Sequence, residues 1–184
     1  MSGSLVKVDE FTISTAVANV ILGGGSAGSS GLNVSIDDTY DVYMVRIHSL
    51  EVDTDQKDIK VRFTESGTPN TTTAYNVAQQ NLNSNQAFDR QNSTAQTTFD
   101  LSLNIGNDTG EQFHSVQYIF QARNSSSFTF LTQENTMMSN AAELRGKQGG
   151  GLFAVSSAVD GIQYIGNGTN IDRGTFVLYG LKKS

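Results

Sequence analysis

Hydrophobic and polar residues alternate with a period of two along much of the chain, the pattern of β-strands that bury one face. In the stretch Asp58–Ser66, the side chains of Ile59, Val61 and Phe63 fall on one face, and charged or hydroxyl side chains fall on the other. Similar patterns predict strands at residues 5–13, 16–22, 40–52, 98–105, 114–122, 127–133 and 175–181. The pattern therefore predicts an all-β chain of roughly ten strands, as in sandwiches and barrels.

The same alternation assigns an inward face to each predicted strand. We expect Tyr43, Val45 and Ile47 to point inward from residues 40–52. In residues 114–122 the more apolar face carries Val116, Tyr118 and Phe120, and in residues 127–133 it carries Phe128 and Phe130. Residues 98–105 would bury Phe99, Leu101, Leu103 and Ile105. The expected core includes Phe63, Leu101, Phe120, Phe130 and Phe176.

Turn signals separate these strands. Asp160-Gly161 lies between two strand-like runs and predicts a hairpin, and Asn167-Gly168 predicts the turn into the last strand. Residues 67–97 are polar and predict a long surface excursion with a short strand near Ala74–Gln79. Glu134–Arg145 is the one stretch where we expect a short helix. The whole predicts one antiparallel, jelly-roll-like β-sandwich domain over residues 1–184.

Composition narrows the classes of function. The formal net charge is −6, and a nucleic-acid binder needs a basic face for phosphates, so we expect no nucleic-acid partner. No run of about 20 apolar residues occurs, so we expect no membrane insertion. The chain has no cysteine and lacks a signal-peptide pattern at "MSGSLVKVDEF". Charged residues are only 16% of the chain, and Ser, Thr and Asn replace them, which suits a particle surface and equally suits any polar β-protein.

No residue group predicts a catalytic site. His48 and His114 both fall in predicted strands, and we expect His114 to be a packed, hydrogen-bonded histidine rather than a base or ligand. A Ser-His-Asp triad stays open, because its members need not be close in sequence. No GxSxG nucleophile motif is present, and the glycine-rich residues 23–31 lack the Gly-Lys-Ser/Thr ending of a phosphate-binding loop.

The remaining candidate is a set of aspartates, Asp53, Asp55 and Asp58, in a turn between two strands. Their oxygen atoms could suit calcium, but Lys57 interrupts them and the glycine and glutamate of an EF-hand loop are missing. A solvated turn is the favoured interpretation. We therefore expect no catalytic residue, no cofactor and no metal, and the binding residues stay unknown.

Three segments carry a resemblance. They are "TYDVYMVRIHSLEVDTDQKDIKVRFTESGT" (39–68), "YIFQARNSSSFTFLTQ" (118–133) and "GGGLFAVSSAVDGIQYIGNGTNIDRGTFVLYGLKKS" (149–184). In this order they resemble a β-sandwich module of virion structural proteins from tailed bacteriophages, with the closest likeness in the terminal "GTFVLYGLK". The resemblance implies a protein made in the host cytoplasm and placed on the virion exterior, in a tail-fibre, receptor-binding or capsid-decorating role.

Three functions follow as expectations. The first is a non-enzymatic structural protein, either a capsid decoration (cement) protein or a compact tail component, whose partners are phage capsid or tail proteins. The alternative is a receptor- or glycan-binding tail-fibre module that uses Tyr75, Asn81 and Gln86 in the long polar segment. A polysaccharide depolymerase is the third, and it is the least supported because no catalytic constellation stands out.

The final strand and the N-terminus bear on assembly. In "GTFVLYG", Phe176 and Leu178 lie on one face and Val177 and Tyr179 on the other, as for a central strand or one covered by a neighbouring subunit. Residues 1–14 could form an extended arm that adds to a neighbour's sheet. The resemblance implies a homotrimer, and the alternative is a monomer whose first strand pairs with its own sheet.

Overall fold

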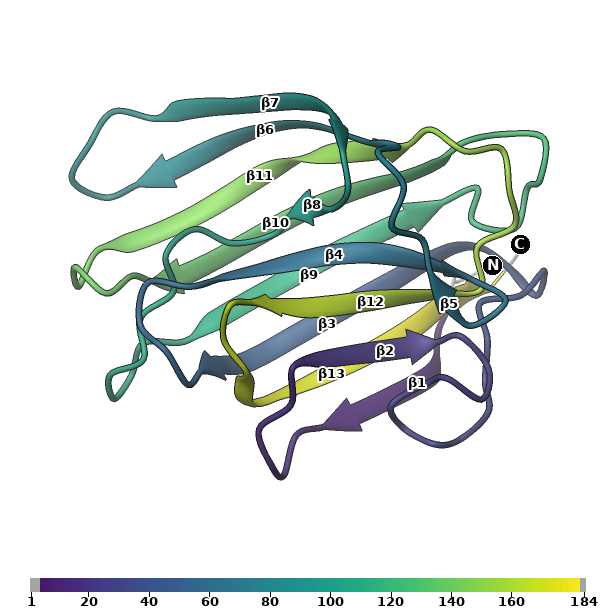
Figure 1. Cartoon of the computed structure of the whole chain (residues 1–184), viewed down its shortest axis with the longest axis horizontal. Coiled ribbons are helices and arrows are strands. Elements are labelled where there is room, and N and C mark those ends of the chain that lie inside the picture. The colour runs from purple at the N-terminus through teal and green to yellow at the C-terminus, as the bar shows by residue number, and fades with distance from the viewer. Residues whose placement is uncertain (1–3, 183–184) are drawn as a thin grey trace.

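The computed structural model describes residues 4–182 and confirms an all-β fold. Two antiparallel sheets, of eight and five strands, pack face to face as a β-sandwich (Figure 1). The large sheet has the order β1 (Leu5–Thr12), β13 (Ile171–Lys182), β3 (Tyr40–Val52), β9 (Phe113–Phe120), β10 (Thr129–Met138), β11 (Leu144–Phe153), β6 (Tyr75–Asn83), β7 (Asp89–Gln96). The small sheet has the order β2 (Asn19–Gly23), β12 (Gly161–Asn167), β4 (Asp58–Glu65), β5 (Thr68–Pro69), and β8 (Phe99–Asp100) pairs with β4.

The strand order shows how the sandwich closes. The last strand, β13, lies inside the large sheet between β1 and β3, with Phe176 and Leu178 in the core and Val177 and Tyr179 on the outer face. In Figure 1 the small sheet lies in front of the large one, and β6 and β7 reach beyond its edge. The two-sheet architecture agrees with the predicted sandwich, and its jelly-roll character remains a prediction. No helix long and apolar enough to cross a membrane occurs in residues 4–182.

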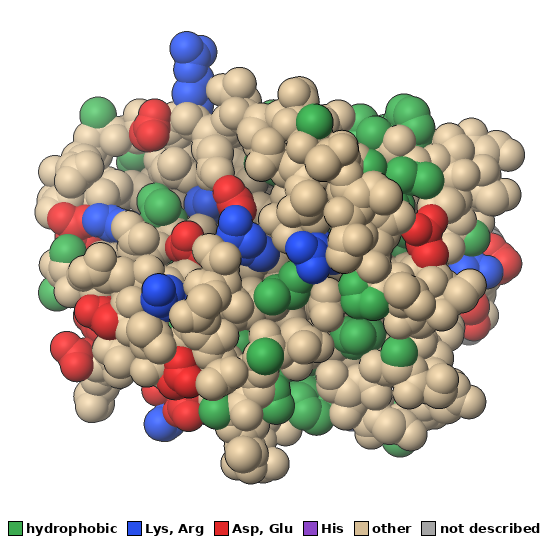
Figure 2. All heavy atoms as spheres, viewed as in Figure 1, with side chains coloured by type: hydrophobic (Ala, Val, Ile, Leu, Met, Phe, Trp, Pro, Cys, Tyr) green, Lys and Arg blue, Asp and Glu red, His purple; other side chains and the backbone are tan. Residues whose placement is uncertain are grey.

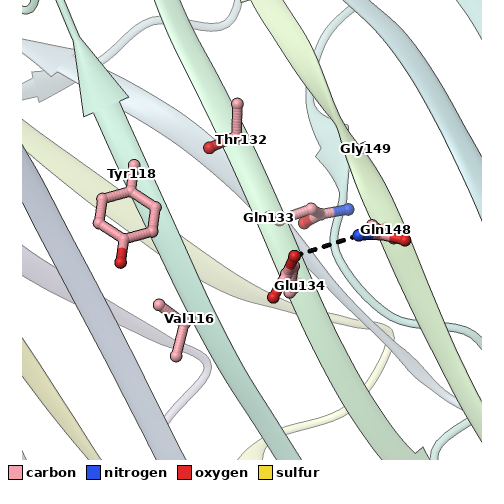
Figure 3. Close-up of a pocket in the computed structure, with 7 residues that line it drawn as sticks. All are labelled: Val116, Tyr118, Thr132, Gln133, Glu134, Gln148 and Gly149. Atoms are coloured by element: carbon pink, nitrogen blue, oxygen red, sulfur yellow. Dashed lines mark hydrogen bonds between the residues drawn. The ribbon is translucent and has the colours of Figure 1, made fainter.

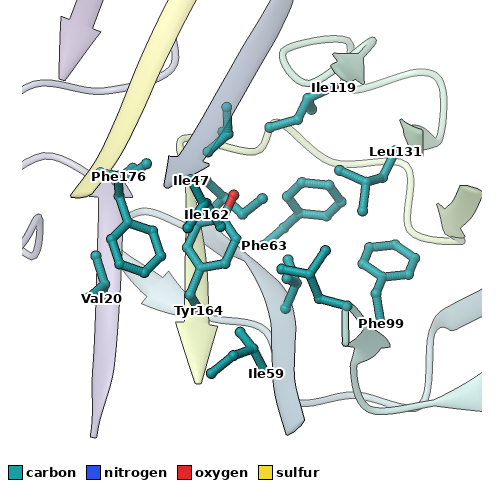
Figure 4. Close-up of a cluster of buried hydrophobic side chains, with 14 of the residues drawn as sticks. Val20, Ile47, Ile59, Phe63, Phe99, Ile119, Leu131, Ile162, Tyr164 and Phe176 are labelled. Carbon is teal, nitrogen blue, oxygen red and sulfur yellow. The ribbon is translucent and has the colours of Figure 1, made fainter. Parts of the chain in front are cut away.

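Aromatic side chains fill the space between the sheets (Figure 4). The Tyr75 ring packs edge-on against Phe99, with ring centroids 4.9 Å apart, and against Phe153 at the same distance. Phe63 contacts the same two phenylalanines at 5.7 and 5.8 Å. These residues come from both sheets, so their burial holds the layers together. Of the expected core residues, Phe63, Leu101 and Phe176 are fully buried, as predicted.

Polar side chains occupy the interior beneath β11. Lys147 is 1% exposed, and its Nζ donates a hydrogen bond to Gln91 Oε1 at 2.8 Å. Gln91 in turn donates to Asp100 Oδ2 at 2.7 Å. Gln79 and Gln133 donate to the backbone carbonyl of Asp100 at 3.0 and 3.3 Å. The segment around β8 thus closes this end of the sandwich through hydrogen bonds, where the small sheet no longer covers the large one.

The predicted helix at Glu134–Arg145 is wrong. Strand β10 continues to Met138, a turn follows, and β11 begins at Leu144. Within the turn the Ala142 N–H donates to the Ser139 carbonyl at 2.9 Å, and Ala142 has a φ of 54°. Full pairing of β10 with β11 satisfies the backbone groups on both sides of the turn. Cross-strand pairing therefore overrides the local helix propensity of this segment.

The hairpin predicted at Asp160-Gly161 is also wrong, because β11 and β12 belong to different sheets. Asp160 instead joins the segment before β12 to β4 and the turn after it. Its carboxylate accepts hydrogen bonds from Thr64 Oγ1 at 2.6 Å and Gly67 N at 2.7 Å. Asn167-Gly168 does start the turn into the last strand, as predicted. The polar residues 67–97 form the ordered β6–β7 hairpin rather than a long loop with one short strand.

The N-terminal strand pairs within its own chain. Strand β1 runs antiparallel to β13, from the pair Leu5–Leu181 to the pair Thr12–Thr175, with a bulge between Lys7 and Asp9. The Asp9 carboxylate, which is 1% exposed, accepts a hydrogen bond from Gly23 N at 2.9 Å. An arm exchanged between subunits would make the same pairing with a neighbour's β13, so the exchanged arm stays a prediction.

Candidate binding surface on the large sheet

The outer face of the large sheet carries side chains that the sequence pattern had placed in the core. Tyr118 and Phe130 are 38% and 44% exposed, and Phe120 is half-buried. The opposite face of β9 and β10 points inward, with Ile119 and Leu131 buried in the core. The predicted inward face of these two strands, Phe128 included at 40% exposed, is therefore wrong.

Buried polar residues explain the error. Gln117 and Gln133 point inward from β9 and β10, where the sequence pattern alone favoured apolar residues. The Gln117 Oε1 accepts a hydrogen bond from Tyr164 at 3.0 Å, and Gln133 donates to the Asp100 carbonyl. Buried amides are tolerated when they are hydrogen-bonded, and these partners come from strands far apart in the sequence. The aromatic residues are left on the outer face.

One apolar residue from each of six neighbouring strands forms a continuous line across this outer face, which we call the apolar row. Strand register places each member directly opposite the next. Leu5 is 51% exposed and Phe130 is 44% exposed, and the other members are partly exposed, so the row is open to solvent along its length. The members, in order across the sheet, are Leu5, Leu181, Val42, Phe120, Phe130 and Leu152.

A second row lies beside the apolar row, two residues along each strand. Register aligns Tyr179, Met44 and Tyr118 from β13, β3 and β9. The row continues through Thr132 of β10 to Gly150 of β11. The large side chains of this row therefore end at Tyr118 of β9, and the outer surface is lower where β10 has threonine and β11 has glycine.

The drop forms a hollow of about 740 Å³ over β9, β10 and β11 (Figure 3). Its lining combines an aromatic ring, Tyr118, with hydrogen-bonding side chains from β10 and β11. Gln148 Nε2 donates to Glu134 Oε1 at 3.1 Å, so these two groups are already paired with each other. The lining residues are Val116, Tyr118, Thr132, Gln133, Glu134, Gln148 and Gly149.

Close approach of neighbouring backbones makes glycine necessary in β11. A Cβ on Gly150 would lie 2.6 Å from the Leu131 carbonyl oxygen. A Cβ on Gly149, whose φ is 148°, would lie 2.5 Å from the Ala78 carbonyl oxygen. Any larger residue at Gly149 or Gly150 would force β6 or β10 away, so the hollow depends on these two glycines. Gly151 instead makes room for the Phe99 ring in the core.

A third row carries opposite charges at fixed positions. Arg46 of β3 and Glu134 of β10 both lie directly opposite Val116 of β9, one on each side. Both charged residues are exposed, and neither forms an ion pair with another of the described residues 4–182. The two charges are therefore held two strands apart on the same face, available to an external partner.

The two histidines lie at the far end of the same face. His48 and His114 line a second hollow of about 450 Å³ together with Arg46 and Thr136. The Ser49 backbone N–H donates to His114 Nδ1 at 3.3 Å. This confirms the predicted hydrogen-bonded histidine, although it faces the outer surface rather than the core.

The structure does not bring the three candidate aspartates together around one point. Asp53 accepts hydrogen bonds from Thr169 Oγ1 and Asn170 N, at 2.7 and 3.0 Å, and these bonds hold the pKa of Asp53 well below its usual value. Asp58 accepts instead from Asn104 N at 2.7 Å. Across residues 4–182, no group of three or more His, Cys, Asp or Glu side chains is placed to hold a metal ion.

The residues expected to bind a receptor do not form one surface. Tyr75 is fully buried in the core, where its hydroxyl donates to the Asn70 carbonyl at 3.0 Å. Asn81 is half-buried on β6, and Gln86 is exposed in the β6–β7 turn. The prediction for Tyr75 is wrong, because its ring completes the core although the residue lies in a polar segment.

The other broad face of the molecule has a different character. Figure 2 shows the side of the small sheet, where acidic and basic side chains lie close to one another and hydrophobic side chains appear in separate groups. One such pair joins Lys60 Nζ to Asp100 Oδ1 at 3.4 Å. The aligned apolar row, Arg46 and Glu134 belong to the outer face of the large sheet.

No protein-family model, curated protein or solved structure matches this chain significantly. The functional argument therefore rests on the residues of this chain, on their arrangement and on the resemblance described above.

Proposed function

We propose that this protein is a non-enzymatic structural component of the exterior of a tailed-phage virion, either a capsid decoration protein or a compact tail component. The resemblance of three segments to such modules motivates the proposal. The observation that carries it is the apolar row on the outer face of the large sheet, because an attached protein needs a surface for its partners. Capsid or tail proteins would be those partners, with a homotrimer as the assembly that the resemblance implies.

The size of the apolar surface supports a role in protein contact. Six strands at a spacing of about 4.8 Å span roughly 24 Å, and two rows of outward residues add roughly 14 Å along the strands. Lys7, Thr132 and Gly150 occupy part of the second row, so the apolar patch is smaller than the full area of about 340 Å² and approaches the few hundred Å² at which such patches are often functional. Tyr118, Phe120 and Phe130 contribute aromatic side chains to it, the residue class enriched at the centre of interfaces.

A receptor- or glycan-binding module is the second candidate, and the hollow beside Tyr118 favours it. An aromatic ring next to paired polar side chains offers a stacking surface and directional hydrogen bonds, the two contacts a sugar ring can use. Thr132, Glu134 and Gln148 supply the polar groups. This candidate uses the same face of the large sheet, so a bound capsid or tail protein and a bound sugar would exclude each other there.

The test compares binding to particles. Virions purified without this protein are incubated with the wild-type chain and with Phe120→Ser/Phe130→Ser, which places two polar residues in the apolar row. We expect saturable binding of the wild type and at least a tenfold loss in the variant. Leu32→Ser is the matched control, because Leu32 is 64% exposed and lies in a loop outside this face. Absence of saturable wild-type binding would contradict the structural proposal.

The same preparations separate the other candidates. Binding of host-surface polysaccharide that is lost in Tyr118→Ala would favour the glycan-binding module instead. Release of new reducing ends from that polysaccharide would identify a depolymerase. Under the structural proposal we expect neither result.

A further inference from the structure

We infer that two copies of this chain pair through the outer faces of their large sheets, related by a two-fold axis that runs along β9. In this arrangement Arg46 of each copy lies opposite Glu134 of the other. The inference goes beyond the proposed function, since it names how the free chain associates with itself. It replaces the homotrimer that the resemblance implies, and binding of a capsid or tail protein through the same face requires this dimer to separate.

The strand order defines the axis. Rotation by 180° about β9 exchanges the strands on its two sides, so β3 lies over the partner's β10 and β13 over the partner's β11. Arg46 and Glu134 are both in register with Val116 of β9, each one strand away from it. The same rotation therefore carries each of these residues onto the position of the other.

Charge complementarity follows from this exchange. An arginine and a glutamate that form no ion pair within the described part of one chain become two symmetric Arg46–Glu134 ion pairs between two chains. Such pairs fix the register of association and disfavour other alignments, because a shift by one strand would leave both charges unpaired. Partial burial at the contact reduces the screening of these charges by salt.

Shape complementarity follows from the second row. Rotation about β9 places the half-buried Tyr179 of β13 over Gly150 of the partner's β11, because both lie in the row that contains Tyr118. The large aromatic side chain thus faces the position where the sheet surface drops into the hollow. Each copy offers one such projection and one such hollow, as a two-fold contact requires.

The apolar row then contacts its own symmetry copy. Phe120 lies on the axis and faces Phe120 of the second copy, while Val42 faces Phe130 and Leu181 faces Leu152. Every member of the apolar row from β13 to β11 is covered by another apolar side chain. Burial of this row provides the main free energy of association.

The available area matches a stable dimer. Five strands from β13 to β11, with the flanking β1 and β6, span about 30 Å, and four rows of outward residues span about 27 Å along the strands. The product, roughly 800 Å², equals the surface that each partner buries in a standard protein–protein interface. Two sheets that pack face to face lie about 10 Å apart with strands nearly aligned, which this rotation permits.

A charge-swap experiment tests the pairing. The mass of the wild-type chain, Arg46→Glu, Glu134→Arg and the double variant is measured by sedimentation velocity over a range of concentrations. We expect a wild-type dimer, at least a tenfold weaker dimer in each single variant, and recovery in the double variant to within about threefold of wild type. Arg90→Glu is the matched control, since Arg90 is exposed on β7, which has no counterpart strand on the other side of the axis.

Thiol cross-linking locates the axis independently. The chain contains no cysteine, so Val116→Cys introduces a single thiol on β9. A cross-linker that reaches about 10 Å, the spacing of packed sheets, should join two copies of this variant. Phe88→Cys, at an exposed site in the β6–β7 turn, should stay uncross-linked under the same conditions.

The outcomes separate the alternatives. A wild-type chain that remains a monomer at about 100 μM, or a double variant as weak as the single variants, overturns the inference. Cross-linking of Phe88→Cys but not Val116→Cys also overturns it. A trimer whose mass is unchanged in all four charge variants shows association through another surface and rejects this contact. Thermal unfolding of each variant confirms that the exposed substitutions leave the fold intact.

Discussion

The hydroxyl of Tyr164 on β12 donates a hydrogen bond across the core to Oε1 of Gln117 on β9, at 3.0 Å. Both residues are completely buried, so the bond joins the small sheet to the large one in a region without solvent. Burial raises the pKa of Tyr164 well above its usual value, which keeps the hydroxyl protonated as the donor. The bond explains how a glutamine can occupy the centre of an otherwise apolar layer.

We expect Tyr164→Phe to lower the free energy of unfolding by about 1–3 kcal/mol, because the buried Gln117 oxygen loses its partner. Urea denaturation measures the change. The control is Tyr179→Phe, whose hydroxyl lies on the outer face and which should change stability by less than about 0.5 kcal/mol. Equal effects at the two tyrosines would contradict the role of the buried bond.

Two phenylalanine truncations test which faces are buried. Phe63→Ala should cost about 3–5 kcal/mol of unfolding free energy, because it removes a ring from a closely packed core. Phe130→Ala should cost less than about 1 kcal/mol in the isolated chain, since the ring is 44% exposed. Both values come from denaturant titrations at a concentration where the chain is monomeric. A large loss at Phe130 would show that this face is covered within a single chain.

Lys147 should make the free energy of unfolding vary with pH in the alkaline range. Burial lowers its pKa in the folded state below the usual 10.5, so the unfolded chain binds more protons between the two pKa values. Stability therefore rises with pH through that interval, by about 1.4 kcal/mol for each unit of pKa difference. Lys147→Met should remove this rise. Its melting temperature should exceed that of the wild type by the largest margin at neutral pH, where the buried lysine is charged. Melting temperatures of both proteins between pH 6 and pH 10 provide the measurement, and parallel curves would contradict the expectation.

Asp53 should make the free energy of unfolding vary with pH in the acidic range. Its hydrogen bonds from Thr169 and Asn170 tie the turn after β3 to the turn before β13 and lower the pKa of the carboxyl group below 3.8. The stabilisation is thus fully present above pH 3.8 and is lost as the pH falls through the lower folded-state pKa. Asp53→Ala should melt lower than wild type at pH 6, and the difference should shrink toward pH 2. Asp55→Ala, in the same turn, should show no such convergence.

The sequence by itself determined the fold class and much of the core. Period-two alternation predicted most of the strands but missed β7 and the adjoining ends of β10 and β11. It correctly placed Ile59, Val61 and Phe63 inward, because one face of that strand is clearly polar. It also predicted the apolar character of both faces of the last strand, and the structure places Phe176 in the core and Val177 and Tyr179 on the outer face of the large sheet. Local patterns suffice where the two faces of a strand differ strongly in polarity.

Only the tertiary structure decided the orientation of β9 and β10. Both faces of these strands mix apolar and polar residues, so alternation cannot say which face is buried. The buried face was the one whose amides, Gln117 and Gln133, found hydrogen-bond partners in Tyr164 and the Asp100 carbonyl. Those partners come from other strands, and no local pattern encodes their proximity.

The candidate surface depended on the same information. The apolar row takes one residue from each of six strands, and the relation of Arg46 to Glu134 exists only through their shared register with Val116. Strand register is set by long-range pairing and by core packing rather than by neighbours in the sequence. The sequence supplied the side chains of this surface, and the folding of distant strands into one sheet aligned them.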